Sequence, residues 1–474
     1  MPNLSILFRC VILLAFSIFS PSLAFAGQSV VQLWLTTADQ TNLLTQKVDQ
    51  HFQVRSAANI DVRVDSSKTY QSMQGFGAAM TDASAIILQK KMSAEQRDKV
   101  MAELFGRENG GLGFDFTRIT IGASDFSEAH YSLDDAPKDQ TDEGLRFFSS
   151  APQAANLVPS LQQALKLNPT LKIMATPWSA PAWMKSNRHL YQGSLNPDFY
   201  DVYAHYFLKF IRTYEQSGIP IDFLSIQNEP HFEPTNYPGM RFDSKDRARF
   251  VGHYLGPLLS ENKVRTRIFD WDHNWDQPES PLAVLADAQA APYIAGIAWH
   301  CYAGSPSAQT IVHDLYPTKE TWLTECSGGG WDADWDSALP SIAGNLIIGS
   351  TRHWAKGVLM WNLILDQHDS PHLGGCDNCR GVLTYNTETG EIKRNIEYYA
   401  FGHISRFVRT GAKRIASTSG IDGIDTVAFE NEDSSKVLLI CNSAVVAHTI
   451  TVEYDGKRFA YTLPRKSVMT AVWK

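Results

Sequence analysis

The chain lacks an excess of positive charge, a dinucleotide-binding motif and, after its first 26 residues, any apolar run long enough to cross a membrane. Its formal net charge at pH 7 is −8 over 474 residues. No cationic surface of the kind that binds nucleic-acid phosphates is therefore indicated. No G-x-G-x-x-G follows the first predicted strand, which argues against an open, doubly wound sheet. A membrane span needs roughly 20 apolar residues, so we expect no stable span in the body of the chain.

Residues 1–26 have the pattern of a secretory signal peptide. Arg9 supplies a positive charge, residues 10–19 are apolar, and residues 24–26 form an A-x-A sequence before Gly27. The alternative is an N-terminal membrane anchor, but the apolar stretch is short for a span. We therefore expect cleavage after residue 26 and a secreted or periplasmic protein.

Cysteine is also scarce, with six residues in the chain, and only one C-x-x-C pair occurs, Cys376 and Cys379 in "GGCDNCRG". A zinc knuckle would require a second pair of ligands. A thioredoxin-like motif would open a helix, whereas this pair lies in a glycine-rich loop. A local disulfide is the favoured interpretation. Cys301, Cys326 and Cys441 are expected to be free, buried thiols.

What the sequence does contain is a regular alternation of two patterns. Short, apolar, β-rich runs recur, and residues with apolar positions at helical spacing separate most of them. The eight predicted strands lie near residues 74–82, 114–126, 171–181, 222–230, 267–274, 294–302, 320–329 and 357–363. This alternation predicts an α/β fold, a (β/α)8 TIM barrel, over residues 71–404.

The two ends of the chain are predicted to form a second domain. Residues 405–474 contain short strand-like runs between turn residues, which is typical of an all-β sandwich. Residues 27–70 are also strand-like and are expected to join the C-terminal sheet. Because no low-complexity linker separates the two units, we expect them to pack closely.

Catalytic side chains of a (β/α)8 barrel lie at the carboxyl ends of its strands. All eight predicted strands carry polar or aromatic residues there: Asp82, Arg118, Ser124, Asp125, Trp178, Asn228, Glu229, Asp270, Asp272, His300, Tyr302, Glu325, Trp361 and Asn362. Any one of them could be an ordinary loop residue. Their shared position at one end of the barrel favours an active site.

Two of these residues are carboxylates on opposite sides of the expected barrel mouth. In "SIQNEP", Pro230 cannot continue a central strand, so Glu229 lies where the fourth strand ends. Glu325 ends the seventh strand, in "TWLTECSGG". Glycoside hydrolysis requires two carboxyl groups that flank one bond, one to donate a proton and the other to attack. We assign Glu229 as acid/base and Glu325 as nucleophile.

The neighbours of these carboxylates support that assignment. Asn228 is placed to contact a sugar 2-hydroxyl group. His300 and Tyr302 are two residues apart and therefore point the same way beside the seventh strand. A hydrogen bond from the Tyr302 hydroxyl would keep Glu325 ionised. We expect the neighbouring carboxylate to raise the pKa of Glu229.

Several stretches in order along the chain make it similar to the glucosylceramidase-type enzymes of glycoside hydrolase family 30, a family of retaining barrel glycosidases. They are "QGFGAAMTDASA", "FTRITIGASDFS", "ATPWSAPAWMK", "SIQNEP", "IAWHCY", "WLTECS", "MWNLILD" and "EYYAFGHISRFVRTGAKRI". The resemblance covers the chain from about residue 70 to its C-terminus.

The resemblance implies roles for further residues. Asp82, Trp178 and Asn228 would bind the glucose, Trp361 and Asn362 would line it, and Arg118, His300 and Tyr302 would support the two carboxylates. Trp178 could instead belong to the core, Arg118 could be a structural ion-pair member, and His300 could be a satisfied barrel histidine. No cofactor is implied.

The implied activity is hydrolysis of glucosylceramide to glucose and ceramide, within sphingolipid metabolism. One stretch, "DQHDSPHLGGCDNCRGVLTYN", looks more like bacterial and fungal members, some of which cleave β-1,6-glucan, so a β-1,6-glucanase is the alternative. A non-catalytic carbohydrate-binding protein is a more remote one. His368, Asp369 and His372 in this stretch could suggest a metal, but loop residues without supporting contacts seldom bind one. The sequence does not predict an oligomeric state.

Overall fold

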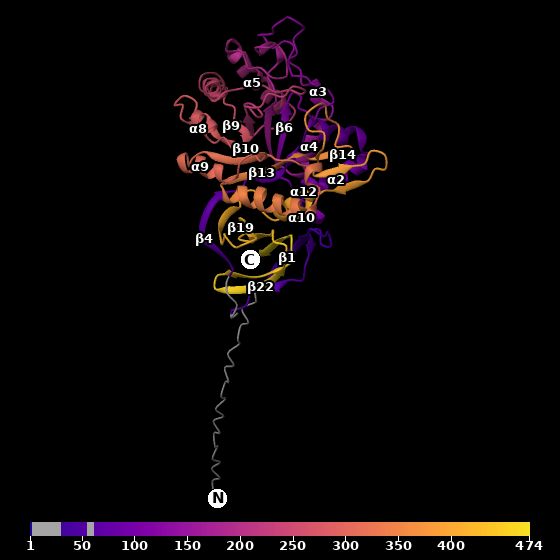
Figure 1. The fold of residues 1–474 in the computed structure, drawn as a ribbon, viewed down its shortest axis with the longest axis vertical. Coiled ribbons are helices and arrows are strands. Elements are labelled where there is room, and N and C mark those ends of the chain that lie inside the picture. The colour runs from indigo at the N-terminus through magenta and orange to yellow at the C-terminus, as the bar shows by residue number, and fades with distance from the viewer. Residues whose placement is uncertain (2–29, 55–60) are drawn as a thin grey trace.

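The computed structural model describes residue 1, residues 30–54 and residues 61–474. The predicted signal peptide, residues 1–26, lies almost wholly outside this part. Figure 1 shows two bodies, a barrel surrounded by helices and a β-structure stacked against one end of it. No helix in the described ranges is long and apolar enough to span a bilayer.

Eight parallel strands close the barrel in the order β10-β11-β13-β5-β6-β7-β8-β9. Their bounds are β5 Gly75–Ala79, β6 Phe116–Ile121, β7 Lys172–Pro177, β8 Phe223–Ser225, β9 Arg267–Asn274, β10 Ile294–His300, β11 Glu320–Glu325 and β13 Ala355–Asn362. Each falls on a predicted strand, so the (β/α)8 prediction is confirmed. The first barrel strand, β5, requires glycine at position 77, because a Cβ there would collide with the Phe116 carbonyl oxygen on β6.

The helices around the barrel bury apolar faces against it. They are α1 Asp82–Ile86, α2 Ala94–Phe105, α3 Ala151–Ala154, α4 Leu157–Leu167, α5 Tyr200–Gln216, α6 Ser244–Phe250, α7 Gly256–Glu261, α8 Glu279–Leu285, α9 Ser307–Leu315, α10 Trp335–Pro340, α11 Ser350–Arg352 and α12 Ile396–Ser405. In α5, Tyr203, Phe207 and Phe210 follow helical spacing and are fully buried. In α2, Ser93 and Gln96 form a reciprocal capping box.

Aromatic side chains fill the amino-terminal half of the barrel. Phe223 and Phe269 stack with ring centroids 5.1 Å apart, and Phe116 meets Trp322 edge-on at 4.8 Å. Met174 and Leu359 complete this cluster. Packed layers of this kind make the barrel interior solid, so a ligand can enter only at the carboxyl ends of the strands.

The second body is a mostly antiparallel sheet in the order β2-β1-β23-β20-β19-β18-β4-β21-β22, with β3 paired to β1. Its strands are β1 Val30–Thr37, β2 Thr45–Gln46, β3 Gln50–His51, β4 Val62–Ser72, β18 Lys413–Ser417, β19 Ile424–Glu430, β20 Lys436–Asn442, β21 His448–Tyr454, β22 Lys457–Leu463 and β23 Ser467–Trp473. Because β1 and β4 lie within it, the N-terminal strands join the C-terminal sandwich, as predicted.

Between β13 and α12 the chain makes a long excursion at the barrel mouth. It contains β14 Ile364–Asp366, β15 Cys379–Arg380, β16 Leu383–Tyr385 and β17 Ile392–Arg394. Strand β15 pairs with β12, Gly328–Gly329, which follows the strand that carries Glu325. The excursion therefore reaches back to the loop beside that carboxylate.

One prediction about cysteine is wrong. Cys301 and Cys326, expected to be free, form a disulfide that joins the loops after β10 and β11. These cysteines are 25 residues apart in sequence, and only the adjacency of the two strands brings them together. The predicted pair, Cys376 and Cys379, also forms a disulfide, and Cys441 is a buried free thiol.

Candidate active site

Glu229 is held at the barrel mouth by an unusual backbone conformation. Its φ is +47°, in the left-handed region that a non-glycine residue seldom adopts. Its backbone N–H donates to the Asp272 carbonyl oxygen on β9 at 3.0 Å, while the preceding N–H, of Asn228, donates to Pro177 on β7. The neighbouring strands therefore impose the conformation, which directs the carboxyl group into the mouth.

Glu325 is the last residue of β11 and is almost fully buried. Its Oε1 accepts a hydrogen bond from the Tyr302 hydroxyl at 2.8 Å, and its Oε2 accepts one from Arg118 at 2.5 Å. One carboxylate oxygen of Glu325 and one of Glu229 lie within 4.8 Å of each other. The two carboxyl groups thus face each other across a space that fits one reacting bond.

Arg118 on β6 is the cation that organises this space. Its side chain is completely buried and donates to Glu325, to the Asn228 amide oxygen at 2.7 Å and to Asp272 at 2.8 Å. The guanidinium also lies 4.8 Å from the ring centroid of Trp178. Burial alone would lower the pKa of Arg118, but the charges of Asp272 and Glu325 raise it. The guanidinium therefore stays charged.

His300, the last residue of β10, bridges two carboxylates. Its Nδ1 lies 3.1 Å from Glu229 Oε1 and its Nε2 lies 3.0 Å from Asp272 Oδ1. Burial would lower the pKa of His300, but the charge of Glu325 and the hydrogen bonds to Asp272 and Glu229 raise it to about 9. At neutral pH both ring nitrogens therefore carry protons and donate to these carboxylates.

The pKa of Glu229 differs from the expectation. Burial would raise it, but the hydrogen bond and the charge of His300 outweigh burial and lower it. The neighbouring Glu325 was expected to raise this pKa, and that expectation is wrong because a cation lies closer to Glu229 than the competing anion does. Of the two groups in this hydrogen bond, the His300 imidazole rather than the Glu229 carboxyl group therefore carries the proton.

Asp272, which had no role assigned from the sequence, is the anchor of both cations. Its carboxylate accepts from Arg118, from His300 and from the Thr324 hydroxyl at 2.6 Å. Burial would raise its pKa, but Arg118 and His300 lower it well below the usual range. The available signal was its position in "DWDHN", at the end of β9, beside the strands of Glu229 and His300.

The predicted sugar-lining aromatics lie together. Trp178 and Trp361 stack with ring centroids 5.0 Å apart, and both are buried. The Asn362 amide oxygen accepts from the Thr81 hydroxyl at 2.9 Å, whereas its buried Nδ2 has no hydrogen-bond partner in the described chain. Such an orphaned donor is costly unless a ligand satisfies it.

Asp82 has hydrogen-bond partners of its own. Asp82 begins α1, and its Oδ2 accepts from Ser127 at 2.8 Å and from Tyr131 at 2.6 Å. Asp125 has its pKa raised to about 7 by burial and by the charges of Glu325 and then Glu229. Asp125 is thus within electrostatic range of the pair, and its Oδ2 also accepts a hydrogen bond from the Cys376 backbone N–H.

The site offers little to a metal or cofactor. Among the described residues, Glu229, His300 and Glu325 could converge on a cation, but both imidazole nitrogens already bond carboxylates. His368, Asp369 and His372 form no such cluster in the part of the chain described. These ligand atoms are therefore engaged in the charge network rather than free.

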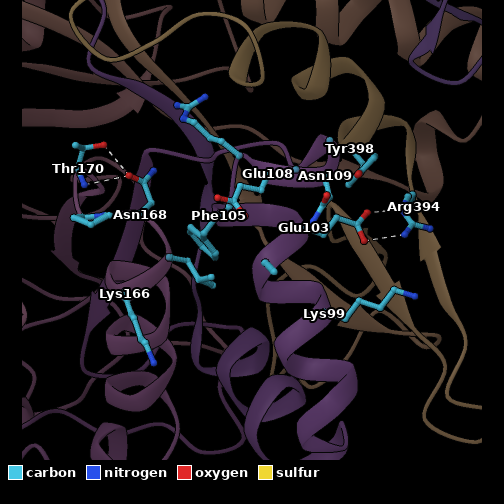
Figure 2. Close-up of a pocket in the computed structure, with 17 residues that line it drawn as sticks. Lys99, Glu103, Phe105, Glu108, Asn109, Lys166, Asn168, Thr170, Arg394 and Tyr398 are labelled. Atoms are coloured by element: carbon cyan, nitrogen blue, oxygen red, sulfur yellow. Dashed lines mark hydrogen bonds and ion pairs between the residues drawn. The ribbon is translucent and has the colours of Figure 1, made fainter.

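A cavity of about 960 Å³ lies away from these carboxylates (Figure 2). It opens between the C-terminal ends of α2 and α4, which lead into the amino ends of β6 and β7. Glu103 there is paired with Arg394, and the Asn168 side chain bonds Thr170. It contains no facing carboxylates and lies at the opposite end of the barrel from Glu229 and Glu325.

The mouth of the barrel contains two facing carboxyl groups, and a tyrosine and an arginine hold one of them. This arrangement is typical of the active site of a glycoside hydrolase. The chain belongs to glycosyl hydrolase family 30. The model of that family's TIM-barrel domain matches residues 73–408, and the model of its beta-sandwich domain matches residues 411–471.

Individual relatives point in two directions. The chain is 32% identical to an endo-1,6-beta-D-glucanase of Trichoderma harzianum, covering 88% of this chain and 87% of the relative. The solved structure of an endo-beta1,6-glucanase superposes with a TM-score of 0.85 at 33% identity, covering 94% of this chain and 99% of the other. The lysosomal acid glucosylceramidase of Mus musculus is 28% identical over 89% of this chain and 84% of the relative.

Proposed function

We propose that this protein is an exported, retaining β-1,6-glucanase. The main support for a retaining mechanism is that an oxygen of Glu229 and an oxygen of Glu325 lie within 4.8 Å of each other. Retaining glycosidases hold their two carboxyl groups about 5–5.5 Å apart. The choice of glucan over glucosylceramide rests on the relatives: two endo-1,6-glucanases match at 32% and 33% identity, and the mouse glucosylceramidase at 28%. The glucosylceramide expectation is not confirmed.

In the first step, a Glu325 oxygen attacks the anomeric carbon and forms a glycosyl ester. The bond to the leaving glucan oxygen breaks, and Glu229 protonates that oxygen. Tyr302 and Arg118 orient the Glu325 carboxylate for attack, since each donates a hydrogen bond to one of its oxygens. Trp178 and Trp361 provide the apolar surface against which the sugar lies.

The proton reaches Glu229 from His300 along their 3.1 Å hydrogen bond. The Glu325 charge is the largest of the contributions that raise the pKa of His300. When Glu325 becomes an ester it loses that charge, so the imidazole holds its proton less tightly. Nucleophilic attack and proton delivery are thereby coupled electrostatically.

In the second step, water attacks the same anomeric carbon and breaks the ester to Glu325. Glu229, now ionised, takes the proton from this water. The restored charge of Glu325 again favours a protonated His300. The sugar leaves with the configuration with which it was bound.

Two disulfides in the described chain support export, because disulfides persist in oxidising compartments. This agrees with the signal peptide predicted for residues 1–26. The protein would therefore act on glucan outside the cytoplasm, whether in a periplasm or in the medium.

The decisive experiment offers purified protein a linear β-1,6-glucan and, in parallel, glucosylceramide in detergent micelles. Oligosaccharides released from the glucan alone are the expected result. Proton NMR of the first products should show the β-anomer before mutarotation. Glucose from the lipid with no products from the glucan would overturn the proposal in favour of a glucosylceramidase.

Two variants test the carboxylate roles. Glu325→Gln should lower kcat by at least about 10⁴-fold and serves as the blank, because the amide cannot form the ester. Glu229→Ala should slow the glucan, whose leaving group needs a proton, by about 10²–10⁴-fold, and should slow a dinitrophenyl glucoside far less. Equal slowing of both substrates by Glu229→Ala would contradict the acid role.

A further inference from the structure

Trp331 is unusual among the tryptophans of the described chain because its side chain is 56% exposed, whereas the others are buried or half-buried. It lies in the loop that follows Glu325. An exposed indole combines a large apolar face with a polar N–H group, which is why tryptophan is enriched at binding surfaces.

The structure holds this indole in a fixed place. It lies over Gly329, where a Cβ would collide with its ring. Arg380 donates to the carbonyl oxygens of Gly329 at 2.8 Å and of Asp332 at 3.0 Å, on either side of the tryptophan. Arg380 is itself bound to the buried carboxylate of Glu397 on α12. These contacts therefore fix the backbone on both sides of Trp331 and hold its exposed ring in one position.

The loop also adjoins the reacting carboxylate through a covalent link. The Cys301–Cys326 disulfide ties the residue after Glu325 to the residue before Tyr302. The Tyr302 hydroxyl bonds Glu325, yet 45% of the side chain remains exposed. Tyr302 and Trp331 thus lie on two loops that the disulfide joins: Tyr302 directly follows Cys301, and Trp331 lies five residues after Cys326.

The charged residues around Trp331 indicate which class of ligand it could bind. Asp332, Asp334 and Asp336 follow it closely in the same loop and helix start, which makes this rim acidic rather than apolar. The nearby cations are paired, Arg465 with Asp336 and Arg380 with Glu397, so this rim carries no excess of positive charge for an anionic membrane. A neutral pyranose ring fits, because its C–H face stacks on an indole and its hydroxyl groups bond the adjacent carboxylates.

We propose that Trp331, with Tyr302, forms a binding subsite for a glucose unit of the glucan chain next to the unit held between Glu229 and Glu325. This inference rests on the proposed β-1,6-glucanase function and extends it. The subsite adds affinity for a chain but none for a monosaccharide glycoside, so it favours polymer over short substrates.

The test compares kcat/KM on linear β-1,6-glucan with kcat/KM on an aryl β-glucoside for the wild type and three variants. Trp331→Ala should lower the glucan-to-glucoside ratio about five- to tenfold, chiefly through KM for the glucan. Trp331→Phe should recover most of the ratio, because the aromatic face remains. Leu315→Ala, at an exposed apolar residue on α9 far from the mouth, should leave the ratio unchanged.

The outcomes separate the two proposals. If the wild type releases nothing from β-1,6-glucan, the proposed function fails and the subsite fails with it. If the wild type cleaves the glucan but Trp331→Ala keeps the wild-type ratio, only the subsite is overturned. A loss of thermal stability in Trp331→Ala is separated from a lost subsite by the activity of Trp331→Phe on glucan.

Discussion

At the scale of single residues, the site is a buried network in which the position of one proton is under electrostatic control. Arg118 and His300 supply positive charge to Glu229, Asp272 and Glu325. Removing one member of such a buried network leaves an uncompensated charge, which costs several kcal/mol. The same low-polarity surroundings make each group's pKa depend strongly on its neighbours.

The pH dependence of His300→Gln tests the stored proton. In the wild type, kcat/KM should fall on the alkaline side as pH rises through about 9, where His300 loses its proton. In the variant, Glu229 must hold the proton itself, and the ordinary pKa of a glutamate is about 4.3. We expect the alkaline limb to move at least one pH unit toward acid in pH–rate profiles.

A matched histidine provides the control for that profile. His231 bonds Gln277 and lies beside Ser280 without a contact to Glu229. The profile of His231→Gln should keep its alkaline limb near that of the wild type. An unchanged limb in His300→Gln would show that the proton is stored elsewhere.

At the scale of elements, a disulfide and a short strand pair link the loops that follow three of the barrel strands. The Cys301–Cys326 disulfide joins the loops of β10 and β11, and the β12–β15 pair joins the second of these loops to the excursion after β13. The Cys376–Cys379 disulfide closes a turn within that excursion. These links constrain the loops around the nucleophile. Glu229, four residues beyond the end of the short strand β8, has a strained backbone conformation.

Removal of each disulfide should have a different effect. The double variant Cys301→Ser/Cys326→Ser opens a loop of 25 residues and should lower the free energy of unfolding by about 3.5 kcal/mol in urea titrations. Cys376→Ser/Cys379→Ser opens a loop of 3 residues and should cost about 2 kcal/mol. The first variant should also lose turnover, since its cysteines adjoin Tyr302 and Glu325. The reverse order of stabilities would contradict this account.

At the scale of the whole molecule, α12 joins the barrel to the sandwich (Figure 1). His403 on this helix is fully buried, and its two ring nitrogens lie 2.9 Å from the Thr470 hydroxyl on β23 and 2.8 Å from the Thr36 hydroxyl on β1. The sheet that receives this contact contains both ends of the described chain. One neutral imidazole therefore bridges the barrel and the two terminal strands.

Acid should weaken this junction through His403. Burial lowers the pKa of His403 to about 3, whereas an exposed histidine titrates near 6.5. Below pH 6.5 the unfolded chain takes up a proton that the folded chain does not, so stability falls as pH drops toward 3. His403→Gln should show a smaller loss of unfolding free energy between pH 7.5 and pH 4.5 than the wild type. Equal losses would exclude this residue as the cause.

The sequence by itself determined the barrel and the order of its strands. Apolar β-rich runs and helical spacing are local patterns, and local patterns persist in the folded chain because each element must bury its apolar face. The prediction that the fourth strand ends at Glu229 is wrong, because β8 ends at Ser225, but the order of the strands placed Glu325 across the mouth. The sandwich strands at both ends of the chain were predictable for the same reason.

Only the tertiary structure decided which side chains meet. Cys301 and Cys326 are distant in sequence and adjacent in space, and Asp82 meets Ser127 and Tyr131, which lie 45 and 49 residues further along the chain. The storage of the proton on His300 also depends on distances of about 3 Å that no spacing in the sequence encodes. Charge–charge and hydrogen-bond energies fall steeply with separation. The pKa values and hydrogen bonds of the site therefore depend on the register of neighbouring strands and on the links between their loops.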